Sequence, residues 1–317
     1  MARDSATRQA WGAVLFRRDE AAPSLLNPRL GILVLVAISV ALGSNHVAAR
    51  IAMDHGASVS AAVAVRSLCT ATVLLALLTQ VWKVPVRLQG RSLRRALFVG
   101  LLVSVQSYCL YSAVRIIPVA LALLVFQTFP LLYMLINWAA GHEKLDRRAL
   151  VAMPLALVGL AITLDVRVEG FAGRWAEIGT GVLWALTASV SFATVFFLNG
   201  HWLKALDGRT RTFYMLGVTG ILVLAAGLAT DALVLPHDGT GWTALVALTL
   251  LYGGALTSLF VVLPKLQGSA STVALNSEPI AVLGIAWLVL GQAVSGTQIF
   301  GAFLTMGAIA YLSLRKG

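Results

Sequence analysis

The segment ALNSEPIAVLGIAWLVLG, residues 274–291, places a carboxylate and a proline side by side in an otherwise apolar run. Pro279 has no backbone N–H to donate to the carbonyl of Leu275, and its ring crowds the preceding helical turn. An ionisable side chain such as Glu278 is costly in an apolar helix unless it faces a cavity or a partner. The pair therefore indicates a helix break of functional interest.

The same pattern occurs a second time, 149 residues earlier in the chain. The stretch QTFPLLYMLINW (127–138) aligns without a gap on NSEPIAVLGIAW (276–287), and Pro130 then falls on Pro279. A tryptophan, an isoleucine and an amide–hydroxyl pair coincide in the same register. The chain is therefore expected to consist of two related halves.

The composition indicates a membrane protein. Hydrophobic residues make up 59% of the 317 residues and charged residues only 12%, whereas soluble domains carry about 25% charged residues. Apolar runs of the ~20 residues needed to cross a bilayer recur along the chain. Ten candidate spans are predicted: 30–50, 60–81, 96–116, 118–140, 148–165, 178–199, 212–233, 242–263, 270–291 and 295–314.

The repeat unit contains five spans, and an odd number forces the two copies into opposite orientations. The predicted fold is therefore an all-α polytopic membrane protein with ten transmembrane helices as 5+5 inverted repeats, the plan of many secondary transporters. The expected parts are a cytoplasmic tail (1–29), a first five-helix repeat (30–165) and a second five-helix repeat (178–314).

The basic residues predict the orientation. With a cytoplasmic N-terminus, nineteen of the 24 lysines and arginines fall in inside segments, as the positive-inside rule requires. Four fall outside, and Arg66 lies within a span. Both termini are thus expected in the cytoplasm, and the protein in the inner (plasma) membrane. Because the net charge of +11 is concentrated between apolar runs, no nucleic-acid partner is predicted.

Further motifs resemble a known family. They are LGSNHVAARIA in the first span, Arg66 in the second, YCLYSAVRIIPVALALLVFQTFPLLYMLINWAAGHEKL, its counterpart STVALNSEPIAVLGIAWLVLGQ, and FGAFLTMGAIAYL. In their order and doubling they resemble the drug/metabolite transporter (DMT) superfamily, in its ten-span EamA-type branch. The sequence departs from the family at His46, where an aromatic residue is more frequent, and at Gln292, where a glutamate usually closes the segment.

The resemblance implies secondary transport by alternating access. It implies export of amino acids or other small metabolites, commonly linked to protons, with the lipid bilayer as the surroundings and the oligomeric state open. A passive facilitator or pore, a membrane-embedded enzyme acting on lipid-linked substrates and a phosphorylated-sugar antiporter are the alternatives. No phosphate-binding loop or metalloprotease spacing is present in the sequence, so no enzyme, cofactor or metal is predicted.

The polar residues of the spans are the candidate binding or coupling residues. Glu278 has no acidic counterpart in the first repeat, and it has two candidate roles, carrying a proton and binding a substrate ammonium, beside a structural ion pair. Arg66 is suited to a substrate carboxylate or phosphate, or to a structural or gating role. His46 can titrate near neutral pH. The remaining candidates for the cavity wall are Asn45, Gln127, Asn276, Tyr108, Tyr111 and Trp184, with Pro130 and Pro279 as the helix breaks.

Overall fold

The computed structural model describes residues 28–142, 175–262, 278–291 and 295–313, with isolated positions between 151 and 162. Within these residues the chain is helical and contains no strand. The helices are α2 (Pro28–Asp54), α3 (Val59–Ala76) followed by a π-helical turn (Leu77–Val81), α4 (Gly90–Ile116), α5 (Val119–Phe126), α6 (Phe129–Ala139), α8 (Trp175–Trp202), α9 (Gly208–Ala229), α10 (Gly239–Val262), α12 (Glu278–Leu290) and α13 (Gly296–Ser313).

The prediction of a helical membrane protein is confirmed. Among the described residues, seven helical stretches are long and apolar enough to cross a membrane: Leu33–Asp54, Val59–Val81, Gly90–Ile116, Val119–Ala139, Ile178–Trp202, Gly208–Ala229 and Gly239–Ser258. The other three predicted spans (148–165, 270–291 and 295–314) each include residues outside the described part. Most of the predicted tail (1–29) also lies outside it. The count of ten therefore stays a prediction.

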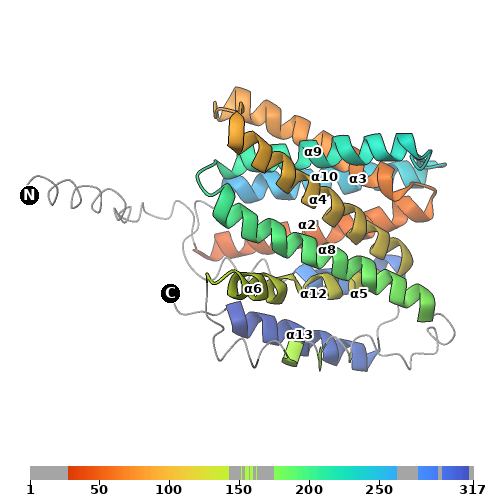
Figure 1. The fold of residues 1–317 in the computed structure, drawn as a ribbon. Helices are drawn as coiled ribbons and strands as arrows, with labels where there is room; N and C mark the ends of the chain where they lie inside the picture. The colour runs from red at the N-terminus through yellow and green to blue at the C-terminus, as the bar shows by residue number, and fades with distance from the viewer. Residues whose placement is uncertain are drawn as a thin grey trace, which may run out of the picture.

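The helices pack side by side in one bundle, whose two ends can be told apart by their connections (Figure 1). At one end, here named the α2–α3 side, the turn after α2 contacts the connection between α9 and α10, and Ser58 N–H donates to the carbonyl of Val234 at 2.8 Å. At the other end, the α8–α9 side, Leu88 N–H donates to the Tyr214 hydroxyl at 3.2 Å. Both ends thus join segments from the two halves of the chain.

The largest cluster of buried apolar side chains lies toward the α2–α3 side. It includes Val63, Val114, Ile117, Leu245 and Leu248, all 2% exposed or less. These residues lie near the start of α3, the end of α4 and the first half of α10. Close packing of this kind leaves no passage for a solute between these helices, so the described part of the bundle is closed at the α2–α3 side.

Local sequence sets the helix boundaries at the same side. The Ser58 hydroxyl caps α3 by accepting from Ala61 N–H at 3.1 Å, a standard N-cap. Gly56 turns the chain with φ +97°, and a Cβ there would lie 2.1 Å from the His237 ring. Only glycine satisfies both the positive φ and this contact.

The fourth predicted span, 118–140, consists of two helices in place of one. Helix α5 ends at Phe126, and α6 begins at Phe129 with Pro130 in its first turn. In a continuous helix, residue 130 would donate to the carbonyl of Phe126, and proline has no N–H to do so. In the second half, α12 begins at Glu278, so Pro279 also lies in a first helical turn.

Candidate functional site

A cavity of about 970 Å³ lies inside the bundle. Its inner end is lined by Asn45, Arg66 and Tyr111. From there it extends toward the α8–α9 side, where its wall includes Lys204 in the connection after α8 and Arg211 in the first turn of α9. Lys204 is exposed, so the cavity reaches the surface at this end. The cavity is therefore a pocket with its mouth at the α8–α9 side and its closed end against the packed core.

Arg66 of α3 is the most deeply buried cation of the wall, with 3% of its surface exposed. Its guanidinium donates to the Tyr111 hydroxyl at 2.9 Å and to Ser107 Oγ at 3.2 Å. The carbon of the guanidinium lies 4.6 Å from the ring centre of Tyr111 and 4.0 Å from that of Tyr252. Cation–π contacts of this type stabilise an arginine that has lost its water.

Arg66 lacks an acidic partner in the part of the chain that the structure describes. The ion pairs found there are His46–Glu278, Arg50–Asp54, His55–Asp238 and Arg209–Asp207. The Nε atom of Arg66 is buried and has no hydrogen-bond partner there either. A positive charge in a cavity wall is suited to binding an anionic group.

Tyr111 joins Arg66 to α2. Its hydroxyl accepts from Arg66 and donates to Asn45 Oδ1 at 2.8 Å. The Asn45 amide in turn donates to the carbonyl of Leu42. The His46 ring packs edge-on against the Tyr111 ring, with the ring centres 5.7 Å apart. Helices α2, α3 and α4 are thus held together by polar contacts at the closed end of the cavity.

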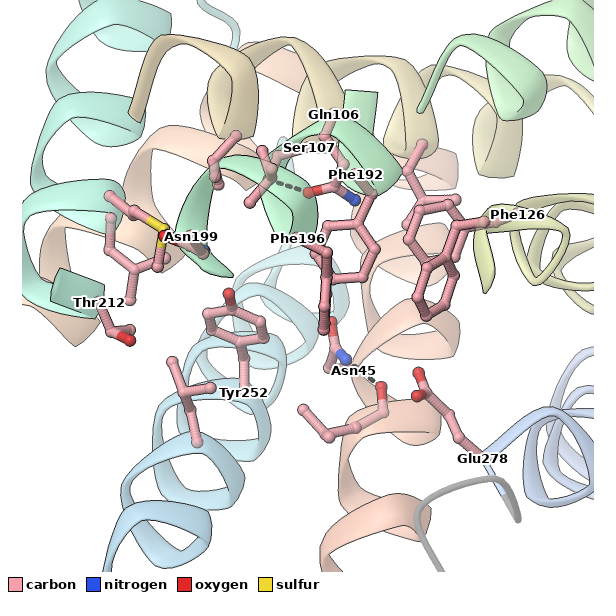
Figure 2. Close-up of a pocket in the computed structure, with 18 of the residues that line it drawn as sticks. Asn45, Gln106, Ser107, Phe126, Phe192, Phe196, Asn199, Thr212, Tyr252 and Glu278 are labelled. Carbon is pink, nitrogen blue, oxygen red and sulfur yellow. Dashed lines mark hydrogen bonds between the residues drawn. The ribbon is translucent and has the colours of Figure 1, made fainter. Parts of the chain in front are cut away.

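Glu278 also lines the cavity, from the first residue of α12. Figure 2 shows its carboxylate directed from α12 toward Asn45 on α2. Its Oε1 atom lies 3.7 Å from His46 Nε2, and 24% of its side chain is exposed. The other ring nitrogen of His46, Nδ1, has no hydrogen-bond partner among the described residues. A carboxylate and a cation therefore lie in one cavity, connected through His46 and Tyr111.

The break in the fourth span also faces the cavity. Gln127, between α5 and α6, lines it. The neighbouring Thr128 hydroxyl donates to the carbonyl of Val125 at 2.8 Å and lies 2.9 Å from Ser189 Oγ on α8. These contacts give the Thr128 hydroxyl partners at the break, where an unpaired polar group would be costly in an apolar medium.

The remaining predicted site residues have other surroundings. Tyr108 is 37% exposed and does not line the cavity; its ring packs edge-on against Trp184 at 6.3 Å. Trp184 likewise packs against the buried core and away from the cavity. Asn276 lies outside the described residues.

Sequence reasoning missed an aromatic group, here named the aromatic wall. It consists of cavity-lining residues from α5, α6 and α8: Phe126, Phe129, Tyr133, Phe192 and Phe196. The sequence signal for it was spacing: Phe192 and Phe196 on α8, and Phe129 and Tyr133 on α6, are each four residues apart on one helix face. Tyr252, Lys204 and Arg211 were also missed as wall residues. Helices α3 and α9 also contribute to the cavity wall, α3 through Arg66 and α9 through residues that include Arg211 and Thr212.

Membrane-spanning helices around a pocket with polar and charged walls are suited to a membrane transporter. The chain belongs to the EamA-like transporter family, whose family model matches residues 29–165 and again residues 179–314. It is 22% identical over 273 residues to Uncharacterized transporter sll1319 of Synechocystis sp., an alignment covering 77% of this chain and 80% of that protein. A solved structure titled "Crystal structure of protein" shares the fold, with a TM-score of 0.61, 19% identity and coverage of 92% of this chain and 100% of the other.

Proposed function

We propose that this transporter is a secondary carrier that exports a small metabolite, with amino acids or related compounds as the substrate class, by alternating access. The observation that carries the proposal is the pocket of about 970 Å³ with Arg66 and Glu278 in its wall. Pockets of 300–1,000 Å³ are typical for small molecules. The two opposite charges match the carboxylate and the ammonium of an amino acid.

The proposed architecture is ten spans in two inverted repeats. Three pairs of helices begin 149 positions apart, which is the spacing of the sequence repeat: Val59 and Gly208, Gly90 and Gly239, and Phe129 and Glu278. The two matches to the family model support the same division. Thr305 Oγ1 lies 3.3 Å from the carbonyl of Ala156, also 149 residues away. Equivalent residues of two repeats meet in this way at a two-fold axis.

The proposed orientation places the α8–α9 side and both termini in the cytoplasm of a cell whose inner membrane holds the protein. The basic residues Lys204, Arg209 and Arg211 cluster around the α8–α9 connection, as expected for a cytoplasmic segment. The pocket then opens to the cytoplasm, where an exporter must load its substrate. Release requires the α2–α3 side to open while the mouth closes.

Glu278 is the proposed coupling or ammonium-binding residue. In the first role it exchanges a proton with each side of the membrane in turn, and in the second it pairs with the substrate. Its position at a helix start, 3.7 Å from His46 Nε2 and partly exposed to the cavity, suits either role. Transport measurements separate the two roles.

The experiment that tests the proposal is counterflow in proteoliposomes. Vesicles loaded with one unlabelled amino acid or small metabolite are diluted into the labelled compound, with a pH-sensitive dye inside. Saturable counterflow is expected for some amino acids. A pH signal lost in Glu278→Gln supports proton coupling, and exchange without a pH signal supports ammonium binding.

A matched control and a contradicting result complete this test. Asp54→Asn removes a carboxylate that pairs with Arg50 at 3.0 Å and does not line the cavity, and it should leave counterflow unchanged. Flux that neither saturates nor shows counterflow would favour a passive facilitator and refute the carrier. Unchanged transport and pH dependence in Glu278→Gln would remove Glu278 from both roles.

A further inference from the structure

The aromatic wall forms a continuous surface along one side of the cavity. The Phe192 ring lies 4.9 Å from the rings of both Phe129 and Phe196, measured between ring centres, and 5.2 Å from that of Phe126. Tyr133 extends the surface, with its ring 6.3 Å from Phe196. Figure 2 shows Phe126, Phe192 and Phe196 grouped together in the pocket that Asn45 and Glu278 also line.

Part of this surface is left uncovered by the residues that the structure describes. Phe196 is 46% exposed although it lines an internal cavity, and Phe126, Phe129 and Phe192 are half-buried. Rings prefer edge-on or offset contacts with other rings at 4.5–7 Å, which is the spacing within the wall. A flat apolar group in the cavity would continue the same packing.

The wall is held in place from both sides of the helix break. Phe126 ends α5 and Phe129 begins α6, while the other two phenylalanines belong to α8. The contact between Thr128 and Ser189 fixes the break to α8 at 2.9 Å. The rings are therefore preorganised, so ordering them on binding costs little.

The two repeats present different chemistry at equivalent positions. Phe129 is the first residue of α6 and Glu278 the first residue of α12, 149 positions apart. One half-helix thus begins with a ring and the other with a carboxylate, both at the cavity. Arg66 adds the positive group to the wall of the same cavity.

We infer that the cavity selects a zwitterion that carries a flat apolar group, the chemical class of the aromatic α-amino acids. The substrate carboxylate binds Arg66, its ammonium binds Glu278, and its ring packs on the aromatic wall. This inference deepens the proposed transport function and rests on it for the identity of the cavity as a substrate site. Phe192 and Phe196 are the specificity-determining residues.

The inference is tested by binding to the purified full-length protein in detergent, so that it does not depend on transport. The probes are L-phenylalanine, L-leucine, L-alanine, 3-phenylpropionate (which lacks the ammonium) and phenethylamine (which lacks the carboxylate). L-Phenylalanine is expected to bind about 10-fold more tightly than L-leucine, since ring contacts add to burial of apolar area. The two single-charge probes are expected to bind at least about 10-fold more weakly than L-phenylalanine, because each leaves one charged wall group unpaired.

Variants locate the selectivity. Phe196→Leu keeps an apolar side chain of similar volume and should remove most of the preference for L-phenylalanine over L-leucine, as should Phe192→Leu. Phe98→Leu is the matched control, because the Phe98 ring packs 6.0 Å from that of Trp202 and does not line the cavity. It should leave the preference unchanged. Melting temperatures measured for each variant identify any that fail to fold.

The outcomes separate this inference from the proposed function. Equal binding of the three amino acids, no binding of any of them, or 3-phenylpropionate binding as tightly as L-phenylalanine overturns the inference even if counterflow of another solute proceeds. A preserved preference in well-folded Phe192→Leu and Phe196→Leu overturns the role of the wall. The expected ranking without counterflow of any solute would uphold the site and reject the carrier.

Discussion

The contact between α2 and α12 gives a direct test of how Glu278 is positioned. Gly43 lies where the two helices approach closely, and a Cβ built on it would lie 2.6 Å from Val282 Cγ2 and 3.3 Å from the carbonyl oxygen of Glu278. Non-bonded carbon atoms prefer about 3.5–4.0 Å. Gly43→Ala therefore forces α12 to move by about 1 Å or Val282 to leave its rotamer, at a cost of about 1–3 kcal/mol.

The clash is with one side chain, so a second substitution should relieve it. Val282 is fully buried, and Val282→Ala alone leaves a hole that costs about 1–3 kcal/mol. In the double variant the new Cβ occupies part of that hole. The double variant is then expected to lose less free energy of unfolding than the two single variants lose together, by about 1–3 kcal/mol.

The assay is the free energy of unfolding in mixed micelles with increasing denaturing detergent, measured for the native protein, both single variants and the double variant. Gly284→Ala is the control, because Gly284 lies on α12 with Val282 and a Cβ there meets no atom of the described residues within 4 Å. Additivity of the two substitutions within about 0.5 kcal/mol would refute the close contact. Counterflow should also slow in Gly43→Ala, since a displaced α12 separates Glu278 from His46.

Three further predictions concern contacts on other elements. Tyr111→Phe removes the hydroxyl that accepts from the buried guanidinium at 2.9 Å and should lower the free energy of unfolding by about 1–3 kcal/mol. Ser189→Ala removes a 2.9 Å hydroxyl contact across the break in the fourth span and should cost about 1 kcal/mol. Outside the spans, the backbone N–H of Gly241, and then the His55 side chain, lower the pKa of Asp238, so Asp238→Asn should lower the melting temperature at neutral pH.

Each of these has a result that would contradict it. An unchanged melting curve for Tyr111→Phe would show that the buried arginine needs no hydroxyl partner, and a loss above about 3 kcal/mol for Ser189→Ala would exceed a single hydrogen bond. A carboxyl whose pKa is lowered in the folded state stabilises the fold at pH values above the ordinary aspartate pKa of about 3.9. This stabilisation is lost as the pH falls through the pKa of the folded state. The melting-temperature difference between the native protein and Asp238→Asn must therefore disappear in acid; a difference that grows in acid would contradict the assignment.

The charged parts of the site could be predicted from the sequence because charge is rare in a membrane helix. Arg66 and Glu278 interrupt apolar runs, and the cost of burying them indicates a cavity or a partner. The repeat register also predicted the position of the break near Pro130, since a missing N–H acts locally.

The aromatic wall could not be predicted in the same way. A phenylalanine in a membrane helix is equally suited to lipid, to a packed core and to a cavity, so its type does not reveal which way it faces. Tyr108 and Tyr111 show the same ambiguity: they lie on one helix, yet Tyr111 contacts Arg66 and Tyr108 packs against Trp184. Which face of α4 meets the cavity is decided by helices distant in sequence.

The packed core at the α2–α3 side has an electrical consequence. A pocket filled with water holds nearly the potential of the solution it opens to, so the membrane voltage falls mainly across the packed layer between the pocket and the far side. One elementary charge crossing that layer exchanges about 2.3 kcal/mol per 100 mV. A zwitterion carries no net charge, so its crossing of this layer involves no net electrical work. A proton that crosses the same layer does electrical work against or with the voltage. Transport driven by voltage would then report the proton alone.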